Sequence, residues 1–187
     1  MRKLAVFNNI SLDGYFCDDK GSMAWAKMDN DAEFNAFTTQ NAQSGGVLLF
    51  GRVTYDMMVS FWPTLAASQM MPEVAERMNN GPKVVFSRSM AAAAWNNTTL
   101  VQDDMPAAVR RMKQEAGPDM VILGSGSIVA QLAAVNLIDE YQVVVNPIAL
   151  GAGRSMFDGL VQPMNLRCIM SRAFKNGKVF LSYQPLA

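Results

Sequence analysis

The stretch Met120-Val121-Ile122-Leu123-Gly124-Ser125-Gly126-Ser127-Ile128-Val129 decides the fold of this chain. An apolar run ends in two glycines separated by a serine, and a segment with helical spacing follows. This order predicts a buried strand, a tight turn and the start of a helix. The free N–H groups and the dipole at a helix start attract anions such as phosphate. An ordinary strand-to-helix turn has the same pattern, so this stretch alone leaves both interpretations open.

Two other predicted strands end in residues that suit an anionic ligand. Gly51-Arg52-Val53-Thr54 follows the apolar run Val47–Phe50, and Ser87-Arg88-Ser89 follows Lys83–Phe86. Arginine at a helix start is unfavourable against the helix dipole, which favours a binding role for Arg52. A solvated loop with one arginine remains the alternative for the Ser-Arg-Ser segment.

Three such strand ends together indicate a ligand with several phosphates. In a parallel sheet the carboxyl ends of the strands lie along one edge, where ligands bind at a switch in strand order. Arginine and hydroxyls together suit a phosphomonoester, so Arg88 favours NADPH over NADH. The spacing departs from the common dinucleotide fingerprint G-x-G-x-x-G, because Val129 stands in place of the third glycine.

Composition narrows the class of protein. The chain has 187 residues and is half apolar, which predicts one domain over residues 1–187. Sixteen basic and 16 acidic residues leave no net charge to attract nucleic acid or an anionic membrane. The absence of histidine excludes catalytic triads and histidine-ligated metals, and the distant Cys17 and Cys168 indicate neither a disulfide framework nor a zinc site. With no signal peptide or membrane-length apolar run, we expect a cytoplasmic protein with no metal, nucleic acid or membrane partner.

Strand and helix patterns alternate over the first three quarters of the chain. The runs Val47–Phe50 and Lys83–Phe86 are short and β-prone, which indicates a parallel or mixed sheet covered by helices on both faces. The last quarter changes to two alternating strands, 166–174 and 179–184. Between them, Asn176-Gly177 predicts a type I′ hairpin turn. The fold class is therefore α/β with a C-terminal antiparallel hairpin.

The order of these motifs resembles the dihydrofolate reductase-like superfamily. Within it, the chain is similar to the C-terminal reductase domain of bacterial bifunctional riboflavin biosynthesis deaminase/reductase enzymes. The resemblance implies a three-layer α/β/α domain with a twisted, mixed, mostly parallel sheet of about eight strands. It also implies NADPH bound across the sheet edge, and often a homodimer. The motifs that carry it are Ser11-Leu12-Asp13-Gly14-Tyr15, Leu49–Tyr55, Lys83–Arg88, Ile122–Ser127, Ile138-Asp139-Glu140-Tyr141, Pro147 and Leu150-Gly151-Ala152-Gly153.

The resemblance also implies roles for individual residues. The first pyrophosphate contacts would come from Gly51, Arg52, Val53 and Thr54, the 2′-phosphate contacts from Ser87 and Arg88, and a second pyrophosphate turn from Gly124, Ser125, Gly126, Ser127 and Ile128. Asp13 would belong to the loop beside the nicotinamide. Glu33 would stand near the carboxylate that helps protonate the pterin in dihydrofolate reductases.

The predicted function is an NADPH-dependent reductase that transfers hydride to a C=N or C=O bond of a small planar heterocycle, such as a pterin or pyrimidine. Without histidine, the proton must come from Glu33, Asp13, a tyrosine or water. Aromatic side chains could stack on the ring, and the candidates are Phe16, Trp25, Phe61 and Trp62.

Two alternatives stay open. One is the riboflavin-pathway reduction of 5-amino-6-(5-phosphoribosylamino)uracil, which needs a further phosphate site for which Arg154 is the single candidate. The other is a non-catalytic NADP-binding dimer. Turnover with dihydrofolate, pterins or pyrimidines would distinguish an enzyme from a binding protein.

Overall fold

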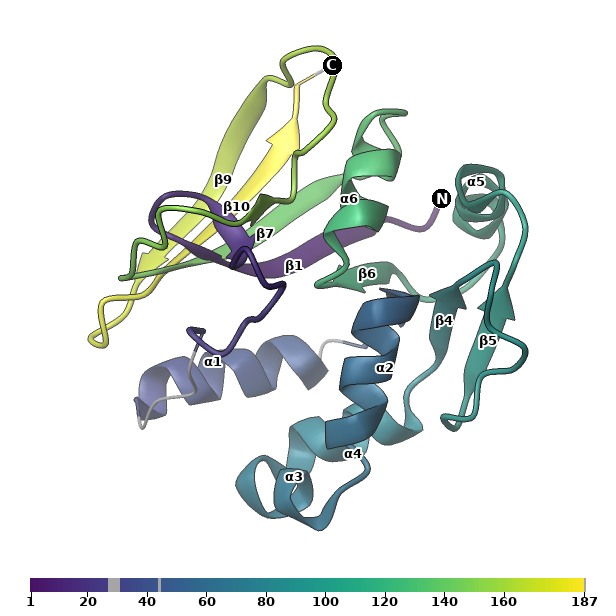
Figure 1. Cartoon of the computed structure of the whole chain (residues 1–187), viewed down its shortest axis with the longest axis horizontal. Helices are drawn as coiled ribbons and strands as arrows, with labels where there is room; N and C mark the ends of the chain where they lie inside the picture. Colours follow the sequence, from purple (N-terminus) through teal and green to yellow (C-terminus); the bar gives the residue numbers. More distant parts are fainter. Residues whose placement is uncertain (27–30, 44, 187) are drawn as a thin grey trace.

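One large sheet organises the molecule (Figure 1). The computed structural model describes residues 1–26, 31–43 and 45–186, and eight strands in them pair in the order β5-β4-β3-β6-β1-β7-β10-β9. The first six are parallel to their neighbours, whereas β10 runs antiparallel to both β7 and β9. This confirms the predicted mixed, mostly parallel sheet with a C-terminal antiparallel hairpin. Its strands are β1 (Leu4–Ser11), β3 (Val47–Gly51), β4 (Lys83–Phe86), β5 (Thr98–Val101), β6 (Met120–Leu123), β7 (Glu140–Asn146), β9 (Leu166–Ala173) and β10 (Val179–Pro185).

Helices cover both faces of the sheet, which makes the three predicted layers. Figure 1 shows α5 and α6 on one side of the sheet and α1 to α4 on the other. Each face has its own apolar core, because successive strand residues point to opposite sides. No helix within residues 1–26, 31–43 and 45–186 has both the length and the apolar character needed to cross a bilayer. The helices are α1 (Ala32–Gln43), α2 (Arg52–Phe61), α3 (Leu65–Met70), α4 (Pro72–Asn80), α5 (Met105–Gln114) and α6 (Gly126–Ala133).

The alternation along β1 separates a core face from a face that lines a cavity. Leu4 and Val6 are completely buried in the core beneath α5 and α6. Ala5, Phe7 and Asn9 point to the other face and are only partly buried. The central strand therefore contributes to the core and to the candidate site at the same time.

Side-chain caps begin two of the predicted helices. The N–H of Phe34 donates to the Asp31 carboxylate over 2.8 Å at the start of α1, and the N–H of Ala107 donates to Asp104 over 2.7 Å at the start of α5. Asp29 and Asn30, which precede Asp31 in the chain, lie outside the described residues.

Three short elements were not predicted from the sequence. β2 (Tyr15–Cys17) and β8 (Arg154–Ser155) pair as a small antiparallel ribbon, and α3 lies between α2 and α4 in the chain. These elements are too short to produce a periodic pattern, so tertiary contacts determine them.

The hairpin turn is also not type I′. The N–H of Gly177 donates to the carbonyl of Phe174, the N–H of Phe174 donates to the carbonyl of Lys178, and of the Asn-Gly pair only Gly177 has a positive φ, +83°. This is a three-residue loop with glycine in the left-handed position, whereas type I′ needs positive φ at both central residues.

Candidate active site

The carboxyl ends of four parallel strands lie side by side at one edge of the sheet. β4, β3, β6 and β1 are neighbours in that order and run in the same direction. The edge therefore brings together Ser87-Arg88 after β4, Gly51 to Thr54 after β3, and Gly124 to Ile128 after β6. The sequence had identified these three segments separately, and their contacts with a ligand remain a prediction.

Hydrogen bonds connect the starts of α2 and α6. The N–H of Ser125 donates to Thr54 Oγ1 over 3.1 Å, and the N–H of Gly51 donates to Ser125 Oγ over 3.0 Å. Ser125 adopts the left-handed conformation, with φ +57°, and its hydroxyl also donates to the Leu123 carbonyl. Thr54 and Ser125 are both buried, so their hydroxyls bind the two helix starts to each other.

The glycines at these junctions make room for protein side chains. A Cβ on Gly51 would come within 3.3 Å of Ile128, and a Cβ on Gly124 within 3.1 Å of Thr54. A Cβ on Gly126 would lie 2.3 Å from the ring of Phe16 in β2. These glycines permit close packing between the two junctions and the ribbon. Their contact with a ligand stays a prediction.

Exposed cations lie at the same edge. Arg88 is exposed beside Ser87, whose hydroxyl accepts from the N–H of Met90 over 3.1 Å. Arg52 is also exposed and forms an i,i+4 ion pair with Asp56 at 3.3 Å. An exposed pair of this kind contributes little to stability, which leaves Arg52 available to an anionic ligand. Val53 and Ser127 are exposed at the first turns of α2 and α6.

Asp13 is held as a carboxylate between two loops. It accepts hydrogen bonds from the Ser11 hydroxyl at 2.6 Å, from the Gly151 N–H at 2.7 Å and from the Leu150 N–H at 3.0 Å. These bonds, with that of Ser11 the largest cause, lower the pKa of Asp13 to about 2. A carboxylate with so low a pKa is a poor proton donor at neutral pH, so the geometry does not favour the predicted catalytic role.

Glu33 lies on the wrong face of α1 to reach the sheet edge. Its Oε1 accepts from Arg172 of β9 over 2.9 Å, and Arg172 stacks on the rings of Phe37 and Phe174. The face of α1 turned toward the sheet carries Phe34, Thr38, Asn41 and Ala42 instead. A shift of one residue between two similar sequences changes the face of a helix on which a side chain lies, so the resemblance alone could not place this carboxylate.

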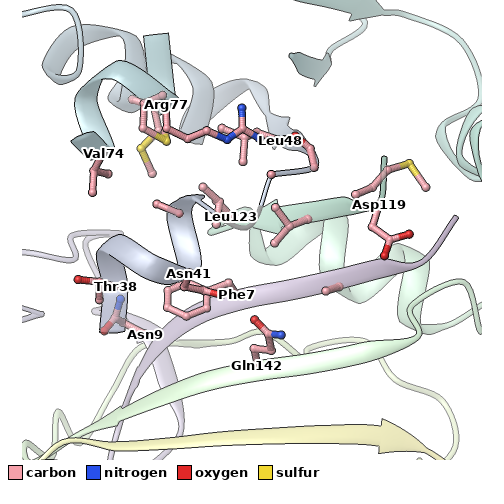
Figure 2. A pocket seen from close by; sticks show the side chains of 18 of the residues that line it. Phe7, Asn9, Thr38, Asn41, Leu48, Val74, Arg77, Asp119, Leu123 and Gln142 are labelled. Atoms are coloured by element: carbon pink, nitrogen blue, oxygen red, sulfur yellow. Dashed lines mark hydrogen bonds between the residues drawn. The ribbon is translucent and has the colours of Figure 1, made fainter. Parts of the chain in front are cut away.

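A cavity of about 680 Å³ lies between α1, α2, α4 and the sheet (Figure 2). Its floor includes Ala5, Phe7 and Asn9 of β1 with Val121 and Leu123 of β6. One end, at Asn9 and Leu123, reaches the carboxyl edge described above. The other end reaches Lys3 and Asp119 at the amino ends of the same strands. The volume lies within the range of small-molecule sites in proteins.

Residues 2–180 match a known family, the RibD C-terminal domain. The chain belongs to the RibD C-terminal domain family. Two relatives from Bacillus subtilis (strain 168) are similar over nearly their whole length. Uncharacterized protein YyaP is 26% identical over 182 residues, which cover 97% of this chain and 94% of YyaP. Uncharacterized protein YwjB is 24% identical over 173 residues, or 92% of each chain.

Solved structures with the same fold include RibD proteins. A candidate riboflavin biosynthesis protein from Shewanella sp. PV-4 has a TM-score of 0.76 and 22% identity, with 99% of both chains covered. Acinetobacter baumannii RibD has a TM-score of 0.70 and 13% identity, with 100% of this chain and 59% of that chain covered. These likenesses confirm the dihydrofolate reductase-like fold, and the family match makes the chain a RibD reductase-like domain.

The residues at the carboxyl edge of this RibD-type domain fit a dinucleotide. The first turns of α2 and α6 present main-chain N–H groups that have no partner within their helices. Ser127 adds an exposed hydroxyl, and the guanidinium groups of Arg52 and Arg88 are accessible. The hydroxyls of Thr54 and Ser125 already bond within the protein, so these two residues would act by positioning the helices.

Most of the residues that line the cavity were not predicted from the sequence. Of the four aromatic candidates for ring stacking, Trp62 lines the cavity, whereas Phe16 packs on Gly126. The signal that could have found the floor was the alternation Ala5, Phe7, Asn9 along β1, which gives a mixed face opposite the one that carries Leu4 and Val6.

Proposed function

We propose that this protein is an NADPH-dependent reductase that acts on a C=N or C=O bond of a small planar heterocycle of the pterin or pyrimidine class. The observation that supports this proposal is that a candidate cofactor site and a cavity lie at the same edge of the sheet. Two linked helix starts and the exposed Arg52 and Arg88 lie at this edge, and the cavity ends there at Asn9 and Leu123. A cofactor held by the first feature would lie next to a substrate held by the second.

The chain's residues would bind and orient both molecules. Arg52, Val53, Ser127 and the main chain around them would hold the pyrophosphate, and Ser87 with Arg88 the 2′-phosphate. When bound, NADPH supplies the hydride. The remaining contribution of the protein is positioning and exclusion of water, which can account for a large part of the barrier in such reactions.

The substrate would lie in the cavity with its ring near the carboxyl edge. Phe7 and Trp62 offer aromatic faces to the cavity, and Asn9 offers an amide. Amide groups suit the neutral donor and acceptor edge of a pterin or pyrimidine.

The proton would come from water at the cavity mouth. Asp13 and Glu33 are engaged elsewhere, and none of the four tyrosines is among the described residues that line the cavity. Burial also raises the pKa of Tyr141 to about 12. We therefore expect Glu33→Gln to retain kcat within about twofold, with an unchanged pH–rate profile. A loss of activity by two orders of magnitude would show instead that Glu33 reaches the substrate.

The test is NADPH oxidation, followed by absorbance, with dihydrofolate, pterins and aminopyrimidines in parallel. Turnover with one of these compounds, and none with an Arg88→Ala variant at low NADPH, is the expected result. Tight NADPH binding without turnover of any compound would favour the non-catalytic NADP-binding dimer.

The family match favours one specific second candidate. A Thermotoga maritima protein with this fold (TM-score 0.66, 13% identity, 99% of this chain and 57% of that chain) is described as a diaminohydroxyphosphoribosylaminopyrimidine deaminase/5-amino-6-(5-phosphoribosylamino)uracil reductase. That reaction belongs in the same assay. Arg154, the predicted contact for the substrate phosphate, is exposed on β8 and does not line the cavity, which places this candidate second.

We also propose a cytoplasmic homodimer. Support for the dimer comes from β9, the edge strand of the sheet, whose Ile169 and Met170 are exposed. An exposed strand edge offers unpaired backbone groups to a second copy. The cytoplasmic location rests on the sequence alone.

A further inference from the structure

The cavity beneath α1 has two unlike sides, and only one of them suits a heterocycle. Asn9 and the pair Glu140 and Gln142 line the β1–β7 side. Gln142 donates to the Glu140 carboxylate over 2.7 Å, and so does the Ser182 hydroxyl. This side is polar, and its hydrogen-bonding groups are organised.

The opposite side, between β3, β6, α2 and α4, is apolar. Six side chains on it pack against the core only partly, because their remaining surface faces the cavity: Ala42, Met58, Trp62, Met71, Val121 and Leu123. Figure 2 shows Leu48 close to the end of the Arg77 side chain, with Leu123 below Val74 and Arg77 of α4. An apolar surface of this extent inside a cavity is stabilised by an apolar ligand.

Methionines make this side adaptable. Met58, Met71 and Met78 contribute to its wall, and unbranched thioether side chains adjust to ligands of different shape. Among the described residues on this side, Arg77 carries a basic side chain, which donates through Nη2 to the carbonyl of Gly46. Lys3 at the amino end and Lys178 of the hairpin line other parts of the cavity. The described residues of the apolar side therefore offer a phosphate group one cation, and that cation is already engaged.

The cavity is also longer than one ring. Asn9 lies six positions after Lys3 in the chain, both residues line the cavity, and a strand rises about 3.3 Å per residue, so the floor extends roughly 20 Å. A two-ring heterocycle between Asn9 and Gln142 leaves the apolar side between β3, β6, α2 and α4 free for a second group.

We propose that the ligand of this cavity is a planar heterocycle carrying an apolar substituent, which lies between β3 and β6 on one side and α2 and α4 on the other. This inference rests on the proposed function for the position of the ring, and it predicts that the substrate is more apolar than a phosphoribosyl compound.

The experiment measures binding of a homologous series of 6-alkylpterins, from methyl to hexyl, by calorimetry in the presence of NADP⁺. Each buried methylene should tighten binding about fourfold. A pterin with a phosphate at the end of the same alkyl chain should bind at least tenfold more weakly than the alkyl compound. Affinity that does not increase with chain length, or tighter binding of the phosphate compound, would overturn the proposal.

Variants test the position of the substituent. Val121→Phe narrows the apolar floor and should weaken binding of the hexyl compound at least tenfold, with less than a twofold effect on the methyl compound. Val161→Phe is the matched control, because Val161 is 86% exposed and does not line the cavity. Ala42→Leu narrows the same side from α1 and serves if Val121→Phe does not fold. Equal losses for short and long chains would contradict the assignment.

Binding affinity and NADPH oxidation together distinguish the apolar site from the reductase activity. A chain-length gradient without NADPH oxidation would support the apolar site and reject the reductase. Turnover of methylpterin without a gradient would support the reductase and reject the apolar site.

Discussion

At the residue scale, two exposed carboxylates that the sequence suggests for catalysis have different surroundings. Asp13 accepts hydrogen bonds from three residues and joins the turn after β1 to the loop after β7. Glu33 forms a salt bridge with Arg172, with both side chains more than 40% exposed. Such exposed pairs contribute about 0–1 kcal/mol. Of the two carboxylates, Asp13 is therefore the one whose replacement should change the stability of the protein.

Replacing Asp13 by Asn should lower stability in a pH-dependent way. The folded-state pKa of Asp13, about 2, lies below its ordinary value of 3.8, so the ionised carboxylate stabilises the folded state above pH 3.8. The stability advantage of the wild type over Asp13→Asn should be constant above about pH 5 and vanish as the pH falls toward 2. Urea denaturation at several pH values measures it.

Asp19→Asn is the matched control, because Asp19 is exposed a few residues further along the chain. It should show no such dependence. A stability difference for Asp13→Asn that is the same at pH 2 and pH 5 would contradict the role of the charge.

Arg88→Ala should separate NADPH from NADH. A charge-assisted hydrogen bond contributes about 1.5–3 kcal/mol, so loss of Arg88 should weaken NADPH binding by about tenfold or more and leave NADH within twofold. Fluorescence titration of both nucleotides measures this. Arg110→Ala, an exposed arginine on α5, should change neither. Equal losses for both nucleotides would refute the 2′-phosphate contact.

At the element scale, the ribbon of β2 and β8 is packed against the start of α6. Phe16 occupies the space beside Gly126, and Asp13 holds the base of the ribbon to the loop at Gly151. The ribbon and the two helix starts thus form one connected assembly. A larger residue at Gly126 should therefore displace the ribbon more than it displaces the sheet.

Gly126→Ala tests this contact. The added Cβ would meet the Phe16 ring at 2.3 Å, and overpacking of this kind costs about 1–3 kcal/mol. In a Phe16→Ala background the same change should be neutral or stabilising by up to about 1 kcal/mol, because alanine favours helix over glycine. The wild type, the two single variants and the double variant form a double-mutant cycle, and the free energy of unfolding is measured for each. Additive effects would disprove the contact.

At the scale of the whole molecule, one part of the sheet is parallel and the other is antiparallel, and the two parts have different roles. The parallel end provides the binding edge. The antiparallel end finishes at β9, which pairs with β10 on one side and has residues Arg167 to Ala173 exposed. An exposed edge strand of eight residues with Ile169 and Met170 at its centre is a liability in a monomer.

We expect light scattering to give twice the mass of one chain. The double variant Ile169→Lys/Met170→Lys should dissociate the dimer with little change in melting temperature, because lysines on a strand edge oppose pairing. Val161→Lys, at an exposed loop position, is the control. A wild-type protein that is monomeric at micromolar concentration would end the dimer proposal.

Much of the fold could be predicted because its signals are local. Short apolar runs such as Val47–Phe50 and Lys83–Phe86, each followed by a turn and a helix, specify a parallel sheet wherever they pack. The carboxyl-edge residues followed from the same logic, since strand ends in a parallel sheet meet at one edge. The hairpin position followed from Asn176-Gly177, although its turn type did not.

The sequence by itself determined the order of strands and helices, the layers, and which segments reach the carboxyl edge, because periodicity and turn residues act over a few neighbours. Only the tertiary structure decided what those residues touch. Gly126 faces Phe16, Asp13 bonds to the loop after β7, and Glu33 pairs with β9. These partners lie 110 to 139 positions apart in the chain, and no local pattern carries contacts over such separations. For the stretch Met120–Val129, the sequence predicted a strand, a turn and a helix start, and the structure showed that its glycines serve packing between elements.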